Sequence, residues 1–87
     1  MATPNGITGE GTATEAGLQL PERVLSLGVF IKVTEDSSNG VEVILNNSEK
    51  GDIVEAGERG FYCTTNLNSL TVKSLDSTPI DFRYSAF

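Results

Sequence analysis

The sequence predicts an all-β protein, a compact antiparallel β-sandwich or small barrel with a flexible N-terminal arm. Apolar and polar residues alternate in several short runs, and turn residues separate these runs at regular intervals. No run has the spacing of an amphipathic helix. Short strands with frequent turns are typical of two packed sheets or of a closed sheet. At 87 residues, the chain has room for one domain.

Residues 1–20 are predicted to be the arm, and residues 21–87 the sandwich domain. The first 17 residues hold four of the nine glycines, and their only large apolar residues are Met1 and Ile7. Such a segment buries too little surface to offset its chain entropy, so we expect the domain to fold without it. The arm either orders on a partner or is a frayed terminus without a role.

The longest alternation covers residues 23–34 and predicts a strand. Its inward side chains are expected to be those of Leu25, Leu27, Val29, Ile31 and Val33. Gly28 predicts a bulge or a bend in this strand, and Phe30, on the polar face, is expected to cover a second small cluster. Asn39-Gly40 predicts that residues 35–40 form a hairpin to the next strand.

Five further strands are predicted, over residues 41–46, 52–55, 59–65, 69–75 and 80–87. Turn-forming residues separate them, for example in the segment Ala56-Gly57-Glu58. Alternation assigns to the core the side chains of Val41, Val43, Leu45, Leu70, Val72, Ile80, Phe82, Tyr84 and Ala86.

Charge and composition disfavour several classes of function. The chain has 12 acidic and 6 basic residues, a formal net charge of −6, and no histidine or tryptophan. Most hydrolytic and metal chemistries are disfavoured without histidine, and scattered basic residues argue against a nucleic-acid partner. No apolar run is long enough to cross a bilayer, and residues 1–6 do not resemble a secretion signal. We expect no enzyme and no membrane partner.

Two candidate chemical sites have simpler explanations. Cys63 is the only cysteine, and without a histidine it cannot be an activated nucleophile, so we expect a small core residue. Asp52, Glu55 and Glu58 offer carboxylates to calcium, but they do not follow a calcium-loop pattern, and a solvated acidic loop is favoured. The sequence predicts no catalytic residue, no cofactor and no metal site.

The C-terminal residues and the size of the core both predict self-association. Tyr84 and Phe87 are expected at an intersubunit contact, because Phe87 falls on the polar face of its strand and aromatic residues are common at interfaces. Without the arm, the domain has about 67 residues, a size at which oligomerisation commonly stabilises a fold. A closed cyclic homo-oligomer, with a trimer favoured, is expected.

Several motifs resemble those of small structural proteins of tailed-phage virions, over roughly residues 20–87. They are Leu20-Pro21-Glu22-Arg23-Val24, Val29-Phe30-Ile31-Lys32-Val33, Asn39-Gly40-Val41-Glu42-Val43, Ala56-Gly57-Glu58, Asn66-Leu67-Asn68-Ser69-Leu70-Thr71-Val72 and a closing aromatic strand. Short all-β domains of this pattern occur as head decoration proteins or as head, neck and fibre accessories. The resemblance implies no catalytic residue. It also implies that the N-terminal segment becomes ordered against the shell.

The resulting hypothesis is a non-enzymatic virion protein that decorates or cements the outside of the capsid. It is made in the host cytoplasm, and its partner is the major capsid protein. The arm is expected to contact the shell through Ile7, Leu18 and Leu20.

Two alternatives stay open. The first is a head or neck fibre accessory, or a receptor-binding module, for which the lack of tryptophan gives weak support for sugar stacking. The second is an acidic inhibitor of a host protein, although the acidic residues are spread over most loops.

Overall fold

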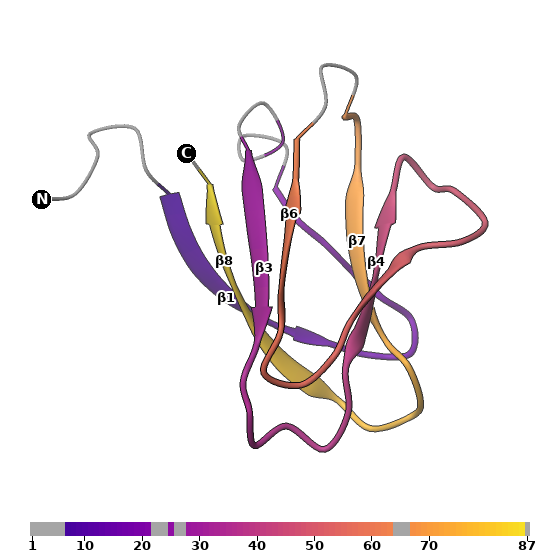
Figure 1. Ribbon diagram of the computed structural model, residues 1–87. Helices are drawn as coiled ribbons and strands as arrows, with labels where there is room; N and C mark the ends of the chain where they lie inside the picture. Colours follow the sequence, from indigo (N-terminus) through magenta and orange to yellow (C-terminus); the bar gives the residue numbers. More distant parts are fainter. Residues whose placement is uncertain (1–6, 22–24, 26–27, 64–66, 87) are drawn as a thin grey trace, which may run out of the picture.

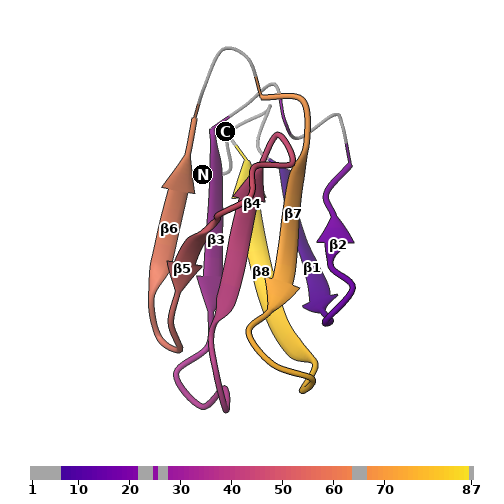
Figure 2. The same cartoon turned by 90° about the vertical axis from the view of Figure 1, so that its right-hand side faces the viewer.

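Eight antiparallel strands form two four-stranded sheets that pack face to face (Figures 1 and 2). The structure, a computed structural model, describes residues 7–21, 25, 28–63 and 67–86. The strands are β1 (Ile7–Ala13), β2 (Leu18–Gln19), β3 (Val29–Val33), β4 (Val41–Leu45), β5 (Asp52–Val54), β6 (Arg59–Tyr62), β7 (Leu70–Ser74) and β8 (Ile80–Ala86). The prediction of an antiparallel β-sandwich is confirmed.

The strands pair in a nested order. The strand β1 pairs with β8, β2 with β7, β3 with β6, and β4 with β5, so the first half of the chain pairs with the second half in reverse. The sheet orders are β1-β8-β3-β6, called sheet A below, and β2-β7-β4-β5, called sheet B. Eight strands with this connectivity form a jelly roll.

The core lies between the sheets and follows the predicted alternation. The ten largest of the fully buried side chains come from both sheets: Phe82, Ile31, Leu70, Ile80, Val29, Val33, Val41, Val43, Val54 and Val72. Leu45 and Tyr84 are partly buried against this cluster. The predicted inward residues are confirmed, except that Leu27 lies outside the described residues.

The predicted boundary of the arm is wrong for residues 7–20. The strand β1 pairs with β8 over its full length, from Ile7 opposite Ala86 to Ala13 opposite Ile80 (Figure 1). Glycines replace large side chains in β1 because aromatic rings from β8 occupy that space. A Cβ at Gly9 would collide with the ring of Tyr84. The glycine-rich segment that was predicted to be a mobile arm is therefore a strand, and aromatic rings of the neighbouring strand β8 cover its glycines.

The predicted hairpin at residues 35–40 is also wrong. The strands on either side, β3 and β4, lie in different sheets, so the segment crosses from one sheet to the other. Gly40 is buried and is needed for close approach, because a Cβ there would collide with the carbonyl oxygen of Val54. Two hydrogen bonds of Asn39 stabilise the segment that crosses between the sheets. Its Oδ1 accepts from the Gly40 N–H at 2.9 Å, and its Nδ2 donates to Asp76 Oδ2 at 3.0 Å.

Within the predicted long strand at residues 23–34, β3 covers only Val29–Val33. Leu25 and Gly28 are described and lie outside any strand, so the predicted strand is too long at these positions, while residues 23–24 and 26–27 lie outside the described residues. The later strands appear close to their predicted positions. Among the strands that the structure describes, β4 and β5 are the one pair of consecutive strands that are neighbours in a sheet. Their connecting turn holds Asn46 and Asn47 at positive φ, a conformation that asparagine tolerates.

Candidate functional site

The outer face of sheet A carries its side chains in rows that cross the strands. Two rows matter below. The charge row consists of Glu10 on β1, Arg83 on β8, Lys32 on β3 and Arg59 on β6, each directly opposite the next. The aromatic row beside it consists of Thr8, Ser85, Phe30 and Phe61, in the same strand order. Alternate residues of a strand point to the same face, so both rows lie on the side away from the core.

An aromatic pair stands at the β6 end of the aromatic row. The rings of Phe30 and Phe61 have centroids 4.6 Å apart and are tilted by 40°, and the Arg59 guanidinium lies 5.5 Å from the Phe30 centroid. Gly28 leaves room for the pair, since a Cβ there would lie 2.7 Å from the Phe61 ring. Phe61 is 54 % exposed. The second cluster that was predicted around Phe30 is therefore present, with an aromatic ring open to solvent.

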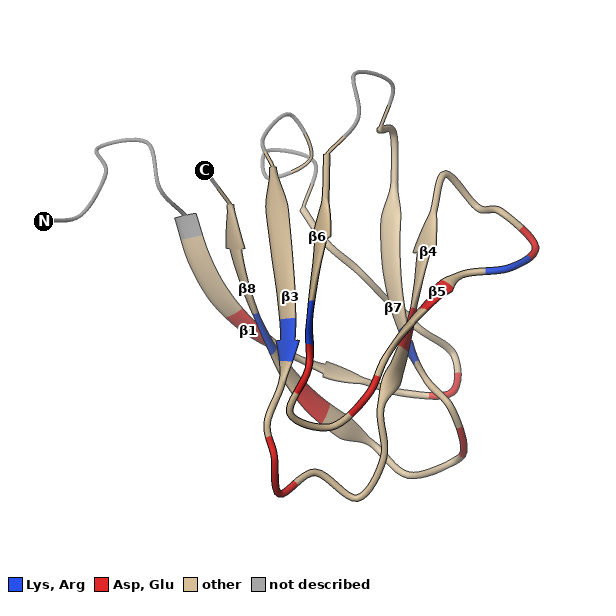
Figure 3. Cartoon of the chain, in the orientation of Figure 1, with Lys and Arg blue, Asp and Glu red and all other residues tan. Residues whose placement is uncertain are grey.

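The charge row gathers half of the basic residues of an acidic protein. Lys32 faces Arg83 on one side and Arg59 on the other, and Figure 3 shows the three basic positions side by side on β8, β3 and β6. Among the described residues, the ion pair is that of Arg83 Nε with Glu10 Oε1 at 3.3 Å, and both side chains are largely exposed. Like charges on directly opposite residues destabilise a sheet. The three neighbouring cations therefore cost the fold some stability, which the ion pair with Glu10 and the contact of Arg59 with Phe30 offset in part.

Replacing Lys32 by glutamine is expected to raise the free energy of unfolding by about 0.2–1 kcal/mol, because it removes the central charge of the row. The gain should be larger at low salt, where exposed charges are less screened. Urea denaturation at two ionic strengths measures it. Lys50→Gln, at an exposed position of the β4–β5 loop, makes the same charge change elsewhere and is the control. An equal gain in both variants would contradict local repulsion in the row.

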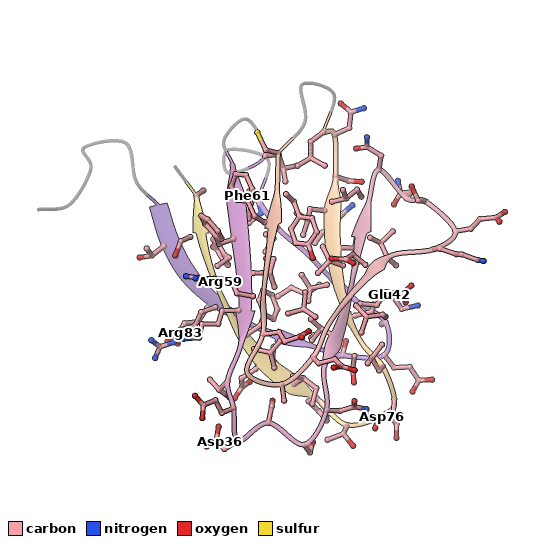
Figure 4. The ribbon with its side chains drawn as sticks, viewed as in Figure 1. Asp36, Glu42, Arg59, Phe61, Asp76 and Arg83 are labelled. Atoms are coloured by element: carbon pink, nitrogen blue, oxygen red, sulfur yellow. The ribbon has the colours of Figure 1, made fainter. Side chains whose placement is uncertain are left out.

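A shallow hollow lies between the two rows. It has a volume of about 220 Å³ and is lined by Phe30, Lys32, Arg59, Arg83 and Ser85. Figure 4 shows Arg59, Arg83 and Phe61 on one side of the molecule, away from Glu42 and Asp76. The lining thus combines three cations, a hydroxyl group and an aromatic ring.

The sandwich ends at β1 and β2 on one side and at β5 and β6 on the other (Figure 2). The strand β1 is seven residues long, whereas the other three edge strands have two to four residues. In the part of the chain that the structure describes, β1 pairs with β8 alone. Thr12 Oγ1 donates to Asp81 Oδ1 at 2.8 Å and fixes β1 to this neighbour. The opposite edge of β1 is the longest open strand edge in the described part of the fold.

The residues predicted to contact the shell do not form an arm. Ile7 begins β1, and Leu18, in β2, is 37 % exposed. Leu20 is 5 % exposed and its N–H donates to the Leu70 carbonyl at 3.0 Å, so it belongs to the core. Tyr84, predicted at a subunit contact, packs against the core of its own chain. Phe87 lies outside the described residues.

The prediction that Cys63 is buried is wrong, because its thiol is exposed. In β6 the inward position belongs to Tyr62, which is 7 % exposed, so Phe61 and Cys63 on either side point outward. The Tyr62 hydroxyl donates to Asp52 Oδ2 at 2.6 Å and links the edge of sheet A to that of sheet B. Burial, and then the hydrogen bond to Asp52, raise the pKa of Tyr62.

Replacing Tyr62 by phenylalanine is expected to lower the free energy of unfolding by about 1–2 kcal/mol at neutral pH, because Asp52 loses a donor. Since the pKa of Tyr62 is higher in the folded state, this stabilisation is complete below pH 10 and is lost as the pH rises further. Denaturation of both proteins between pH 7 and 11 tests this. Tyr84→Phe is the control. A steep alkaline loss that persists in Tyr62→Phe would contradict the assignment.

The described residues contain no group of three or more cysteine or acidic side chains placed to hold a metal ion. Of the acidic residues considered for calcium, Glu58 Oε1 accepts from the Glu55 N–H at 3.1 Å and Asp52 accepts from Tyr62. Their contacts thus stabilise the turn and the sheet edge. Within these same residues there is also no helix with the length and apolar character that a bilayer span requires.

No protein-family model, curated protein or solved structure matches this chain. Two surface features are left to suggest a function. One is the open edge of β1, and the other is the outer face of sheet A with its charge row and aromatic row.

Proposed function

We propose that this chain is a non-enzymatic structural protein of a tailed-phage virion, which decorates or cements the outside of the capsid. The observation that carries the proposal is the open edge of β1, a seven-residue strand with one pairing neighbour. Its partner is the major capsid protein, and a strand of that protein pairs with the edge. The protein binds as a trimer.

The edge of β1 is suited to strand addition. A long edge strand offers a row of backbone donors and acceptors, and proteins normally protect such edges with charges, prolines or short length. Within β1, Glu10 is the single charged residue, there is no proline, and Gly9 and Gly11 leave a backbone without bulky side chains. An added strand would satisfy these backbone groups and bury the edge.

The topology supports the same proposal. Jelly rolls recur in viral capsid proteins, although they also occur in lectins and other proteins, so the topology alone does not select a function. Because β1 is already held by β8, its binding to a shell costs less conformational entropy than the ordering of a mobile arm.

The reason for a trimer differs from the one that the sequence suggested. With residues 7–20 in the sandwich, the domain is larger than the 67 residues first assigned to it, so core size no longer requires self-association. A trimer is retained because three linked edges attach far more tightly than one.

The test is sedimentation with empty capsids of the phage that encodes the chain, preceded by light scattering to obtain the mass in solution. We expect a trimer that binds saturably. Thr8→Lys places a charge on the edge strand and should weaken binding at least tenfold, whereas Thr14→Lys, one residue beyond β1, should not. Equal binding of both variants would exclude the β1 edge. A monomer that stays in the supernatant would favour a fibre accessory or an inhibitor of a host protein.

A further inference from the structure

We propose that the outer face of sheet A binds a carboxylate-bearing saccharide, of the uronic-acid type, between Phe61 and the three cations of the charge row. This site lies on the face of the sheet and not on the edge of β1. The inference does not depend on the proposed attachment to a capsid.

The charge row provides the electrostatic part of the site. Arg83, Lys32 and Arg59 are cross-strand neighbours, which costs the folded state some stability unless an anion lies among them. Two arginines present planar groups of donors that match a carboxylate. Lys32, between them, has no carboxylate within ion-pair distance in the part of the chain that the structure describes. An anionic group in the hollow would compensate Lys32 and Arg59, whereas Arg83 is already paired with Glu10 through its Nε.

The aromatic row provides the part that selects a sugar. Phe61 is 54 % exposed and stacks against Phe30, which lines the hollow, so the Phe61 ring can cover the C–H face of a pyranose that extends beyond it. Ser85 lines the hollow, and Thr8 lies opposite Ser85 on β1, so hydroxyl groups continue the row. An aromatic ring can stack on the C–H face of a sugar, and the neighbouring hydroxyl groups can form hydrogen bonds with the sugar hydroxyls.

The surroundings of the row disfavour nucleic acid and favour a sugar. Glu10 and Asp81 flank the cations on β1 and β8. Their carboxylates repel a chain of closely spaced phosphates more than a sugar with one carboxylate per ring, and they accept hydrogen bonds from sugar hydroxyls. The net charge of −6 further opposes a polyanion of high charge density.

The size of the hollow sets the mode of binding. Its volume of about 220 Å³ is below the roughly 300–1,000 Å³ of sites that enclose drug-sized ligands, so one ring enters and the rest of the chain lies on the sheet. For one ring we expect a Kd on the order of 1 mM, and tighter binding for an oligosaccharide.

The experiment is a titration of the ¹⁵N-labelled protein with a trisaccharide of galacturonic acid, followed by amide chemical shifts. We expect saturable shifts at Phe30, Lys32, Arg59, Phe61 and Arg83, and weaker binding at high salt. Three other probes are run in parallel: a neutral glucose trisaccharide, an oligothymidylate and a tetraglutamate peptide.

The variants separate the site from general electrostatics. Lys32→Ser and Arg59→Ser should each weaken binding about tenfold, because each removes a charge-assisted hydrogen bond. Phe61→Ser should weaken it several-fold. Lys50→Ser makes the same charge change on an exposed loop and should bind as the parent protein does. All four positions are exposed, and the amide spectrum of each variant shows whether it is folded.

Four results would overturn the proposal. They are the absence of saturable shifts with trigalacturonate, equal binding of the neutral trisaccharide, tighter binding of the oligothymidylate or the tetraglutamate, and an equal loss in Lys50→Ser. The saccharide titration contains no capsid. Its outcome therefore neither supports nor contradicts the proposed attachment to a capsid.

Discussion

Replacing Phe82 by alanine is expected to lower the free energy of unfolding by about 3–5 kcal/mol, the largest effect of a single truncation in this core. Phe82 is 1 % exposed and has the largest of the fully buried side chains. It lies on β8, between β1 and β3, and its ring also covers Gly11 of β1. Its removal therefore leaves a cavity and uncovers part of β1. Urea or guanidinium denaturation measures the loss.

The matched control is Phe61→Ala, which makes the same truncation on the outer face of the same sheet. Phe61 is 54 % exposed and pairs with Phe30, so we expect a loss of no more than about 1.5 kcal/mol. Similar losses in the two variants would contradict the assignment of inner and outer faces to sheet A.

Replacing Ala13 by aspartate is expected to destabilise the protein by about 4 kcal/mol or more, because it places an unpaired carboxylate in the core. Ala13 is fully buried at the end of β1, opposite Ile80. Such a loss approaches the total stability of about 5–15 kcal/mol of an ordinary domain, so much of the variant should be unfolded at neutral pH. Circular dichroism and thermal denaturation report it.

Ala16→Asp is the control, three residues later in the exposed turn that follows β1. It makes the same chemical change and should alter stability by no more than about 0.5 kcal/mol. If Ala13→Asp were equally harmless, residues 7–20 would be the mobile arm that composition suggests. The comparison is cleaner than removal of residues 2–17, since that deletion takes away β1 itself.

Alternation of apolar residues predicted most of the sandwich. It identified the strands that became β3, β4, β7 and β8, and it assigned Val29, Val43 and Phe82 to the core. This succeeds because the two-residue period of a strand is a local property, which each segment carries by itself.

The pairing of strands depends on residues far apart in the chain, and the predictions that depended on pairing were wrong. A run rich in glycine has the composition of a mobile arm, and only the rings of Tyr84 and Phe82, some seventy residues later, make β1 a covered strand. Asn39-Gly40 has the composition of a hairpin turn, yet Gly40 is needed for the approach of Val54 from β5. Neither neighbour could be inferred from the segment itself.

The candidate site was predicted only in part. Phe30 was recognised as an apolar residue on a polar face, and that signal led to the aromatic pair. The charge row had no signal in the sequence, because Lys32, Arg59 and Arg83 are far apart in the chain and meet through strand register. Cys63 was misplaced because the inward position of β6 belongs to Tyr62.

The central claim is our proposal that the edge of β1 pairs with a strand of a phage capsid protein. Hydrogen exchange of the protein mixed with empty capsids of the phage that we propose as its source tests this claim most directly, because each amide that becomes paired at an edge strand is protected. The account predicts that the amides of residues 7–13 that point away from β8 gain protection on binding, while β6, at the opposite edge of sheet A, keeps its free-state exchange rates. Absence of binding, or protection that appears at β6 and not at β1, would contradict it.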